Sequence, residues 1–314
     1  MRIIPLSTLK KSAQYVIIQR MKPYADRTPD SQYRNLLEKI MREGRRTMPI
    51  HGEEARSLVG VQMRFDLDNG FPLVTERDLT KLMNGGLSEH FAFLHGARTQ
   101  EELEKWGCKW WKDWVTPEKC AIFDLPPGDL GPGSYGPAWA AFPTAEGKPF
   151  NQIVEVMRQL KEKPFLRTHI ITPWIPQYAI QHSGLKRKVV VAPCHGYLHI
   201  FAYPETKELS VHHFQRSGDV PTGVPFNMIQ YGAFTLMVAQ FMGYKAKELV
   251  YTISDAHIYE RQYPFVEDLL KREPKRLPTV TLNPDIKDLL DFRPEHFTLT
   301  DYEPHPAMRV PTPV

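Results

Sequence analysis

The stretch VVVAPCHGYLHIFAYPETKELSVHHFQRSGDVPTGVPFN (Val189–Asn227) organises the interpretation of this chain. It predicts one strand at Val189–Val191, which leads to Cys194 and His195, and a second strand at Glu208–Phe214. A turn rich in glycine and proline then leads into an apolar helix. The polar residues after the second strand are Gln215, Arg216, Ser217, Asp219 and Asn227. A thiol, a guanidinium, a carboxylate and an amide are therefore expected to converge on one active site.

The amino-acid composition limits the classes to which this protein can belong. The chain has 314 residues, 42% of them hydrophobic, which suffices for a substantial core. No apolar run approaches the roughly 20 residues of a membrane span, and the start, MRIIPLSTLKK, lacks the apolar core of a secretory signal. We therefore expect a cytoplasmic protein without a membrane partner. Three cysteines without a CxxC pair, Cys108, Cys120 and Cys194, predict neither a disulfide framework nor a metal site.

The formal net charge of +4 is unevenly distributed. Residues 1–50 hold eleven Lys and Arg against four Asp and Glu, a net of +7, so residues 51–314 carry −3. We interpret residues 1–31 as a basic N-terminal arm ahead of a single domain at 32–314. A solvated surface is preferred for this arm over a segment that binds polyanions, and no nucleic-acid partner is expected.

Hydrophobic periodicity outlines the remaining elements. A capping-box pattern at Thr99–Glu102 starts a short helix. Helical spacing predicts helices at 33–41, through Glu89 and Leu94, and at 151–160, 226–242, 259–272 and 285–290. Alternation and short apolar runs predict strands at 59–67, 168–174, 248–253, 280–282 and 297–300. Helices and strands mix without a regular βαβ repeat, which predicts an α+β fold.

Four tryptophans lie close together in WGCKWWKDW (Trp106–Trp114). Aromatic residues at this density usually fill a core. A platform of rings for a flat ligand is the alternative interpretation, and the residues alone leave it open.

Cys194 has two interpretations. A buried cysteine is more often inert packing than a nucleophile. Arg216 changes this balance, because a cationic group on the adjacent strand lowers the pKa of a thiol. His195 suggests a Cys/His protease, but neighbouring residues of a strand point to opposite faces. The pattern therefore favours Michael-type attack by the thiol without an immediate histidine base.

Several segments resemble thymidylate synthases. APCHGYLHIF, QRSGDVPTGVPFN and SDAHIY resemble the three best-known segments of that family. FPLVT, the Glu89 helix, the tryptophan block with LGPGSYG, and REPKRLP match in the same order, from about residue 33 to the C-terminus. The resemblance implies an α+β fold, with helices around a mixed sheet and two sheets packed back to back in a homodimer. It also implies methylation of dUMP to dTMP with 5,10-methylenetetrahydrofolate, and no metal.

The resemblance implies roles for single residues. Cys194 is expected to add to C6 of the uracil ring, Glu89 to organise proton transfer through water, and Tyr135 to assist removal of the C5 proton. Asn227 is expected to read uracil O4 and N3–H, because one amide offers a donor and an acceptor; the family's cytosine-specific hydroxymethylases carry Asp there. The residues implied to bind phosphate and sugar are Arg216, Ser217, Arg46, His257, Tyr259 and, from the other subunit, Arg167.

The folate site is implied by a carboxylate, aromatic rings and the C-terminus. Asp219 is expected to accept hydrogen bonds from pterin N–H groups, while the rings supply apolar stacking. The tail RVPTPV is expected to close over the bound folate and exclude water. The residues implied to contact the co-substrate are Asp219, Trp111, Trp114, Phe226 and Val314.

The chain also departs from the family pattern. The segment GRRTMPIHGEEARS differs in sequence and length from the family's phosphate-binding loop, Thr168 replaces one of a pair of arginines, and Ala92 replaces a tryptophan. One alternative is a pyrimidine nucleotide 5-hydroxymethylase for a dUMP, UMP or CMP-type substrate, with water in place of hydride. Another is a catalytically silent nucleotide-binding paralogue. Trp111 favours hydride transfer, and retention of Cys194 and Glu89 argues against a silent protein.

Overall fold

A six-stranded mixed sheet forms the centre of the computed structural model, which describes residues 21–49 and 52–312. Its strand order is β1-β2-β6-β5-β4-β3, and β5 and β6 are parallel while the other neighbours are antiparallel. The predicted α+β class is therefore confirmed. The strands are β1 (Arg45–Thr47), β2 (Ala55–Asp66), β3 (Ile170–Ile171), β4 (Tyr197–Tyr203), β5 (Glu208–Asp219) and β6 (Lys245–Tyr259).

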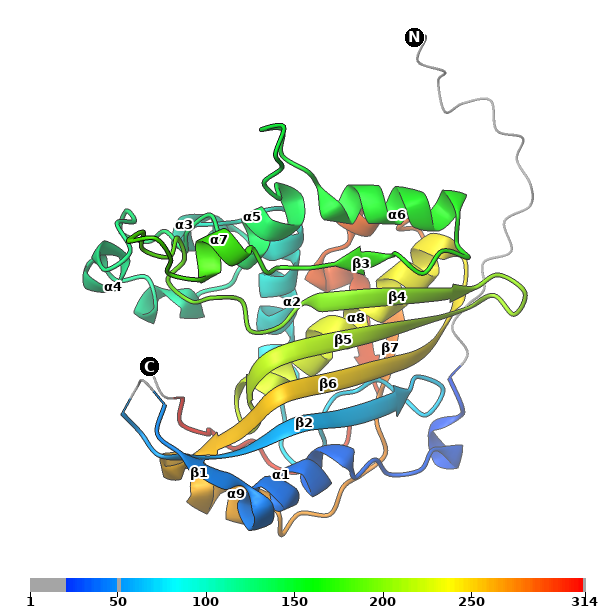
Figure 1. The fold of residues 1–314 in the computed structure, drawn as a ribbon. Helices are drawn as coiled ribbons and strands as arrows, with labels where there is room; N and C mark the ends of the chain where they lie inside the picture. Colours follow the sequence, from blue (N-terminus) through cyan, green and yellow to red (C-terminus); the bar gives the residue numbers. More distant parts are fainter. Residues whose placement is uncertain (1–20, 50–51, 313–314) are drawn as a thin grey trace.

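Helices pack around this sheet, and a small antiparallel pair of strands, β7 (Thr279–Leu282) and β8 (Phe297–Thr300), stands apart from it. Figure 1 shows β2, β6, β5 and β4 across the front and α2 and α8 behind them. The helices are α1 (Gln32–Glu43), α2 (Thr80–Leu94), α3 (Gln100–Lys105), α4 (Pro117–Ala121), α5 (Tyr135–Ala140), α6 (Gln152–Glu162), α7 (Pro176–Ala179), α8 (Gly223–Met242) and α9 (Tyr263–Leu269).

Helix α8 occupies the core because nearly all its side chains are apolar. A helix that is hydrophobic all round has no solvent face, so it is buried on every side. It connects the parallel strands β5 and β6 behind the sheet (Figure 1). Gly243 ends it in the left-handed conformation at φ 68°, as the sequence predicts. Close packing against α8 requires a second glycine, because a Cβ on Gly232 would lie 2.8 Å from Pro72.

The opposite face of the sheet carries no helix within the described chain (Figure 1). Leu198 and Ile200 of β4 point to the core, so their neighbours point to this open face. His199 and Phe201 lie on it with ring centroids 4.1 Å apart. Ile170 of β3, 51% exposed, extends the apolar surface.

Two predicted strands differ in the structure. Val189–Val191 does not form a strand. Its backbone bonds instead to the loop before α5, where the carbonyl of Leu130 accepts from Val190 N–H. Gly131, at φ 95°, permits this approach, since a Cβ there would lie 2.4 Å from the carbonyl oxygen of Lys188. The strand predicted at 168–174 is reduced to the two residues of β3. Beyond it, Thr172 N–H donates to Gln152 Oε1 at 3.0 Å instead of to β4, and Pro173 has no N–H.

Two predicted helices also differ. The helix predicted at 259–272 is shorter, because β6 continues through Tyr259 between β2 and β5. A 3₁₀ turn (Glu260–Gln262) follows, and α9 then begins with Pro264 in its first turn. In place of the helix predicted at 285–290 there is one 3₁₀ turn at Leu289–Asp291.

Both ends of the described chain pack on the domain. Within the predicted arm, residues 1–20 lie outside the described residues, whereas Arg27 is buried and donates to the carbonyl of Leu277 at 2.9 Å. Near the other end, His305 N–H donates to the carbonyl of Thr75. The C-terminal segment thereby runs beside the FPLVT residues towards the site.

Candidate active site

Cys194, the predicted nucleophile, lies directly before β4. Its N–H donates to the hydroxyl oxygen of Tyr135 at 2.8 Å, and its carbonyl accepts from the backbone N–H of Arg216 at 2.7 Å. The Nη2 of Arg216 lies 3.4 Å from Sγ. The structure therefore brings the thiol, the guanidinium and the phenol together from the loop before β4, from β5 and from α5.

The guanidinium of Arg216 is oriented by carbonyl groups. Nε donates to Pro193 at 2.8 Å and Nη2 to Ala192 at 2.7 Å. Burial raises the pKa of Cys194, while the charge of Arg216 and the hydrogen bond with Tyr135 lower it; the net direction is upward. Arg216 lowers the pKa of the thiol as predicted, but desolvation outweighs this effect, so the pKa of Cys194 lies above its ordinary value.

His195 turns away from the thiol. Its Nδ1 bonds the hydroxyl of Tyr231 at 2.5 Å, and its ring stacks on Tyr135 with centroids 4.4 Å apart. Burial lowers the pKa of His195 to about 3, so the ring is neutral. The two side chains separate as predicted, but strand alternation is not the reason, since Cys194 lies outside a strand.

Glu89 of α2 is buried and accepts three hydrogen bonds. Its Oε1 accepts from the indole N–H of Trp110 at 2.7 Å and of Trp111 at 2.6 Å. Its Oε2 accepts from Nε2 of Gln230 at 2.7 Å. Burial raises the pKa of Glu89, and the three hydrogen bonds oppose that rise by stabilising the charged form.

The tryptophans of the block differ in how deeply they are buried. Trp111 is buried and holds Glu89, while Trp110, in the 3₁₀ turn Trp110–Asp113, is 37% exposed and lies 5.7 Å from the ring of Phe226. Trp114 is half-buried, with Lys119 Nζ 5.2 Å from its ring. Trp110 was not singled out from the sequence, because its place beside Glu89 depends on how the turn packs against α2.

Asn227 is buried near the start of α8, between two glutamines. Its Oδ1 accepts from Nε2 of Gln215 at 3.2 Å. Its Nδ2 donates to Oε1 of Gln230 at 2.9 Å. A chain of amides thus joins Asn227 to Glu89. The sequence held one signal for Gln230, since it is a polar residue within the apolar run 226–242.

Asp219 lies at the end of β5, beside the C-terminal segment. It accepts from the backbone N–H of Thr222 at 3.1 Å and from Nε2 of Gln262, and burial raises its pKa to about 6. Gln262 also donates to the carbonyl of Pro311 at 3.0 Å, which brings the C-terminal segment next to this carboxylate. Val314, predicted to contact folate, lies outside the described residues.

A second polar cluster surrounds Asp255. Ser217 donates to its Oδ2 at 2.8 Å, Ser57 to its Oδ1 at 2.6 Å, and His257 Nδ1 lies 3.2 Å away. Burial raises the pKa of Asp255, but these hydrogen bonds dominate and hold it at about 2. His257 and Tyr259 share a face of β6, with ring centroids 4.9 Å apart, as their spacing predicts.

Two further residues implied to bind phosphate, Arg46 and Arg167, have exposed side chains. Arg46 of β1 pairs with Glu54 at 3.4 Å, and its side chain is 72% exposed. Arg167 is exposed ahead of β3, where its carbonyl contacts His199 Nε2 at 3.1 Å.

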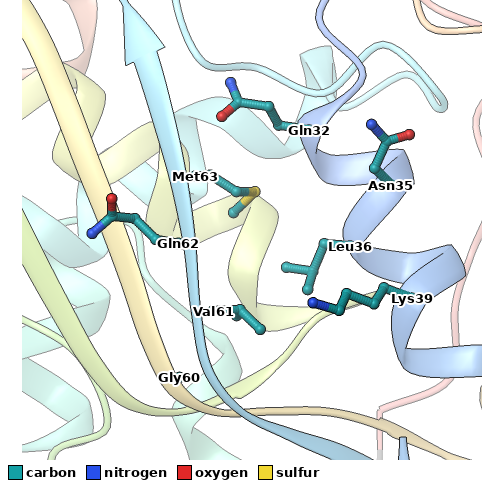
Figure 2. Close-up of a pocket in the computed structure, with 8 residues that line it drawn as sticks. All are labelled: Gln32, Asn35, Leu36, Lys39, Gly60, Val61, Gln62 and Met63. Atoms are coloured by element: carbon teal, nitrogen blue, oxygen red, sulfur yellow. The ribbon is translucent and has the colours of Figure 1, made fainter. Parts of the chain in front are cut away.

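Features typical of other kinds of site are absent from the described chain. In residues 21–49 and 52–312, no three His, Cys, Asp or Glu side chains are grouped to hold a metal. No described helix is long and apolar enough to cross a membrane. Figure 2 shows a hollow between α1 and β2, lined by Gln32, Asn35, Leu36, Lys39 and residues 60–63. None of the predicted site residues lines it.

The structure places a thiol beside a guanidinium and links a buried carboxylate through amides to Asn227. Residues 31–314 match the family model described as thymidylate synthase, nearly the whole chain. The protein belongs to the thymidylate synthase family. It is therefore an enzyme of one-carbon transfer to C5 of a pyrimidine nucleotide, with methylenetetrahydrofolate as co-substrate.

Proposed function

We propose that this protein converts dUMP to dTMP by reductive methylation at C5, with 5,10-methylenetetrahydrofolate as carbon and hydride donor. The choice of uracil as the base rests on one observation. Nδ2 of the Asn227 amide donates to Gln230, and its Oδ1 accepts from Gln215. An amide has two N–H groups and two lone pairs, so one donor and one acceptor remain on Asn227. They complement O4 and N3–H of uracil.

Cys194 is the proposed nucleophile that adds to C6. Attack requires the thiolate, and the guanidinium of Arg216, 3.4 Å from Sγ, stabilises that charge. Three N–H groups of Arg216 point at Ala192, Pro193 and Sγ, which leaves the Nη1 edge for the phosphate. Glu89 and Tyr135, both buried, are proposed to handle the C5 proton, Glu89 through water.

His257 and Tyr259 are proposed to bind the sugar, and Ser217 the phosphate. The adjacent rings on β6 support joint use of the first pair. Ser217 donates to Asp255 and retains lone pairs rather than a hydrogen. Binding a phosphate through Ser217 therefore requires that its hydroxyl rotate away from Asp255.

The side chains near Glu89 fit the co-substrate, which supplies the methylene carbon and the hydride. Trp110 and Phe226 form a partly exposed aromatic pair, and Trp111 lies beside them. Asp219 presents a carboxylate that accepts hydrogen bonds from N–H groups of a pterin. Gln262 ties the C-terminal segment to Asp219, so we propose that the last residues cover this site.

We further propose a homodimer in which the open sheet faces of two copies pack together. The support is the face without a helix in Figure 1, with Ile170 51% exposed and Phe201 beside His199. An exposed apolar sheet face is typical of an interface. In this arrangement Arg167 of the partner subunit supplies a second charge to the phosphate near Arg216, and the site is shared between subunits.

One assay tests the proposed reaction. The purified protein is incubated with dUMP and methylenetetrahydrofolate, and dihydrofolate absorbance and nucleotide mass are followed together. Methylation gives dTMP with one dihydrofolate for each nucleotide. A product heavier than dTMP by one oxygen atom, with tetrahydrofolate, would instead establish hydroxymethylation. Nucleotide binding without turnover of any pyrimidine nucleotide would establish a silent paralogue.

A further inference from the structure

Gln230 is a fully buried polar side chain in α8, a helix whose side chains are nearly all apolar. Its Oε1 accepts from Asn227 at 2.9 Å, and its Nε2 donates to Glu89 at 2.7 Å and to the carbonyl of Gly86 at 3.1 Å. Burying an amide is unfavourable unless its polar atoms are paired. Two of these bonds go to groups of the proposed site, Asn227 and Glu89, so the amide bridges them.

The orientation of the Gln230 amide follows from its partners. The carboxylate of Glu89 and the carbonyl of Gly86 accept hydrogen bonds and cannot donate them. The NH₂ group must therefore face them, and Oε1 must face Asn227. Only Nδ2 of Asn227 can donate to that oxygen, so the Asn227 amide is oriented as well.

Gln215, on the Oδ1 side of Asn227, favours the same orientation of the Asn227 amide. Nε2 of Gln215 donates to the carbonyl of Ser217 at 2.9 Å, which orients that amide. The same Nε2 then faces Oδ1 of Asn227 at 3.2 Å. Turning the Asn227 amide over would place two donors against each other at Gln215 and two acceptors against each other at Gln230.

We propose that Gln230 is a positioning residue that decides which pyrimidine Asn227 accepts and links this choice to Glu89. The inference rests on the proposed function, in which Asn227 reads the base. Uracil presents the acceptor O4 beside the donor N3–H, and cytosine presents a donor and an acceptor in the opposite order. An Asn227 amide turned over would match cytosine. Gln230 disfavours that state, because it would leave two buried acceptors unpaired.

Gln230 also donates a hydrogen bond to Glu89, a carboxylate for which the described chain supplies hydrogen-bond donors rather than a positive charge. Trp110 and Trp111 bond to its other oxygen, and the titratable groups that face it are Cys108 of the tryptophan block, Tyr135 of α5 and Tyr231 of α8. The N–H of Gln230 is one of three donors that favour the ionised carboxylate. Removing it raises the pH at which Glu89 loses its proton.

Two isosteric variants separate these effects. Gln230→Met removes both bonds. Gln230→Glu keeps an acceptor oxygen towards Asn227 but removes the N–H towards Glu89. The control is Gln240→Met, on the same helix, where the amide bonds only the carbonyls of Asn283 and Ile286. For each protein, kcat/KM is measured with dUMP and with dCMP over a range of pH.

We expect the preference for dUMP over dCMP to fall at least about tenfold in Gln230→Met, the factor that corresponds to about 1.4 kcal/mol. We expect it to persist in Gln230→Glu, while the acidic limb of the pH profile moves upward in both variants. Gln240→Met should match the parent protein. An unchanged preference in Gln230→Met, or an unchanged acidic limb in both variants, would overturn the inference.

Failure of the proposed function would give a different experimental result. If the parent protein does not methylate dUMP, the same preference is measured as the ratio of Kd values for dUMP and dCMP by calorimetry. A parent that prefers dUMP and a Gln230→Met variant that does not would still support the positioning role. Equal binding of the two nucleotides by the parent would refute it. If Gln230→Met does not fold, the acidic limb of Gln230→Glu decides the link to Glu89: a limb that moves upward supports the inference, and an unmoved limb overturns it.

Discussion

Glu89→Gln is the substitution that most directly tests the buried carboxylate. It keeps the shape of the side chain and removes its charge. In the structure, Oε1 accepts from two indole N–H groups and Oε2 from Gln230. A glutamine has only one oxygen. If that oxygen keeps Trp110 and Trp111, its NH₂ group faces the Nε2 of Gln230, and one buried donor loses its acceptor.

The effect on stability should be modest. An unpaired buried donor costs about 1–3 kcal/mol, but the variant no longer buries the charge of an ionised Glu89, which opposes that cost. A net loss of 1 kcal/mol lowers the melting temperature of a domain of this size by roughly 2–4 °C or less. The effect on turnover should be far larger, because a positioned acid or base contributes about 10²–10⁴-fold.

The assay compares kcat and kcat/KM for dUMP in the parent and in Glu89→Gln, with melting temperatures from circular dichroism. Glu101→Gln is the matched control, since its side chain is 81% exposed and pairs only with Lys105. We expect Glu89→Gln to lose at least about 100-fold in kcat and the control to lose nothing. Turnover of the folded Glu89→Gln variant at the parent's rate would refute the role of Glu89 in proton transfer.

Three further predictions concern other parts of the molecule. Cys194→Ser should abolish turnover while dUMP still binds in calorimetry; near-normal turnover would exclude this thiol as the nucleophile. Burial raises the pKa of Glu76 to about 7, so the native state loses stability as pH rises from about 4.5 through 7. Glu76→Gln should remove this decline and gain about 3 kcal/mol at pH 8 in urea unfolding; identical pH dependence of both proteins would contradict it. Gln262→Leu removes the bonds to Asp219 and Pro311, and should raise KM for methylenetetrahydrofolate more than KM for dUMP; equal changes would argue against a closing C-terminal segment.

Much of the fold is predictable because it depends on local periodicity. The uninterrupted apolar run at 226–242 implies a buried helix, and α8 is that helix. The spacing of His257 and Tyr259 implies one face of a strand, and their rings do meet. The capping box at Thr99 and Glu102 is present with both of its hydrogen bonds. Each of these features needs only neighbours within a few residues.

Predictions failed where distant segments decide the local structure. Val189–Val191 has the residues of a strand, but its hydrogen bonds go to the loop before α5. The pKa of Cys194 lies above its ordinary value because the surrounding chain desolvates the thiol more than Arg216 stabilises its charge.

The sequence by itself determined the α+β class, the buried helix α8 and the identity of the chemical groups near Cys194. Only the tertiary structure decided how those groups are paired. Glu89, Trp110, Gln230 and Asn227 come from α2, a 3₁₀ turn and α8, and their hydrogen bonds form where these elements pack. The physical reason is that hydrophobic periodicity sets which face of an element is buried, whereas a buried polar atom must find its partner across the core.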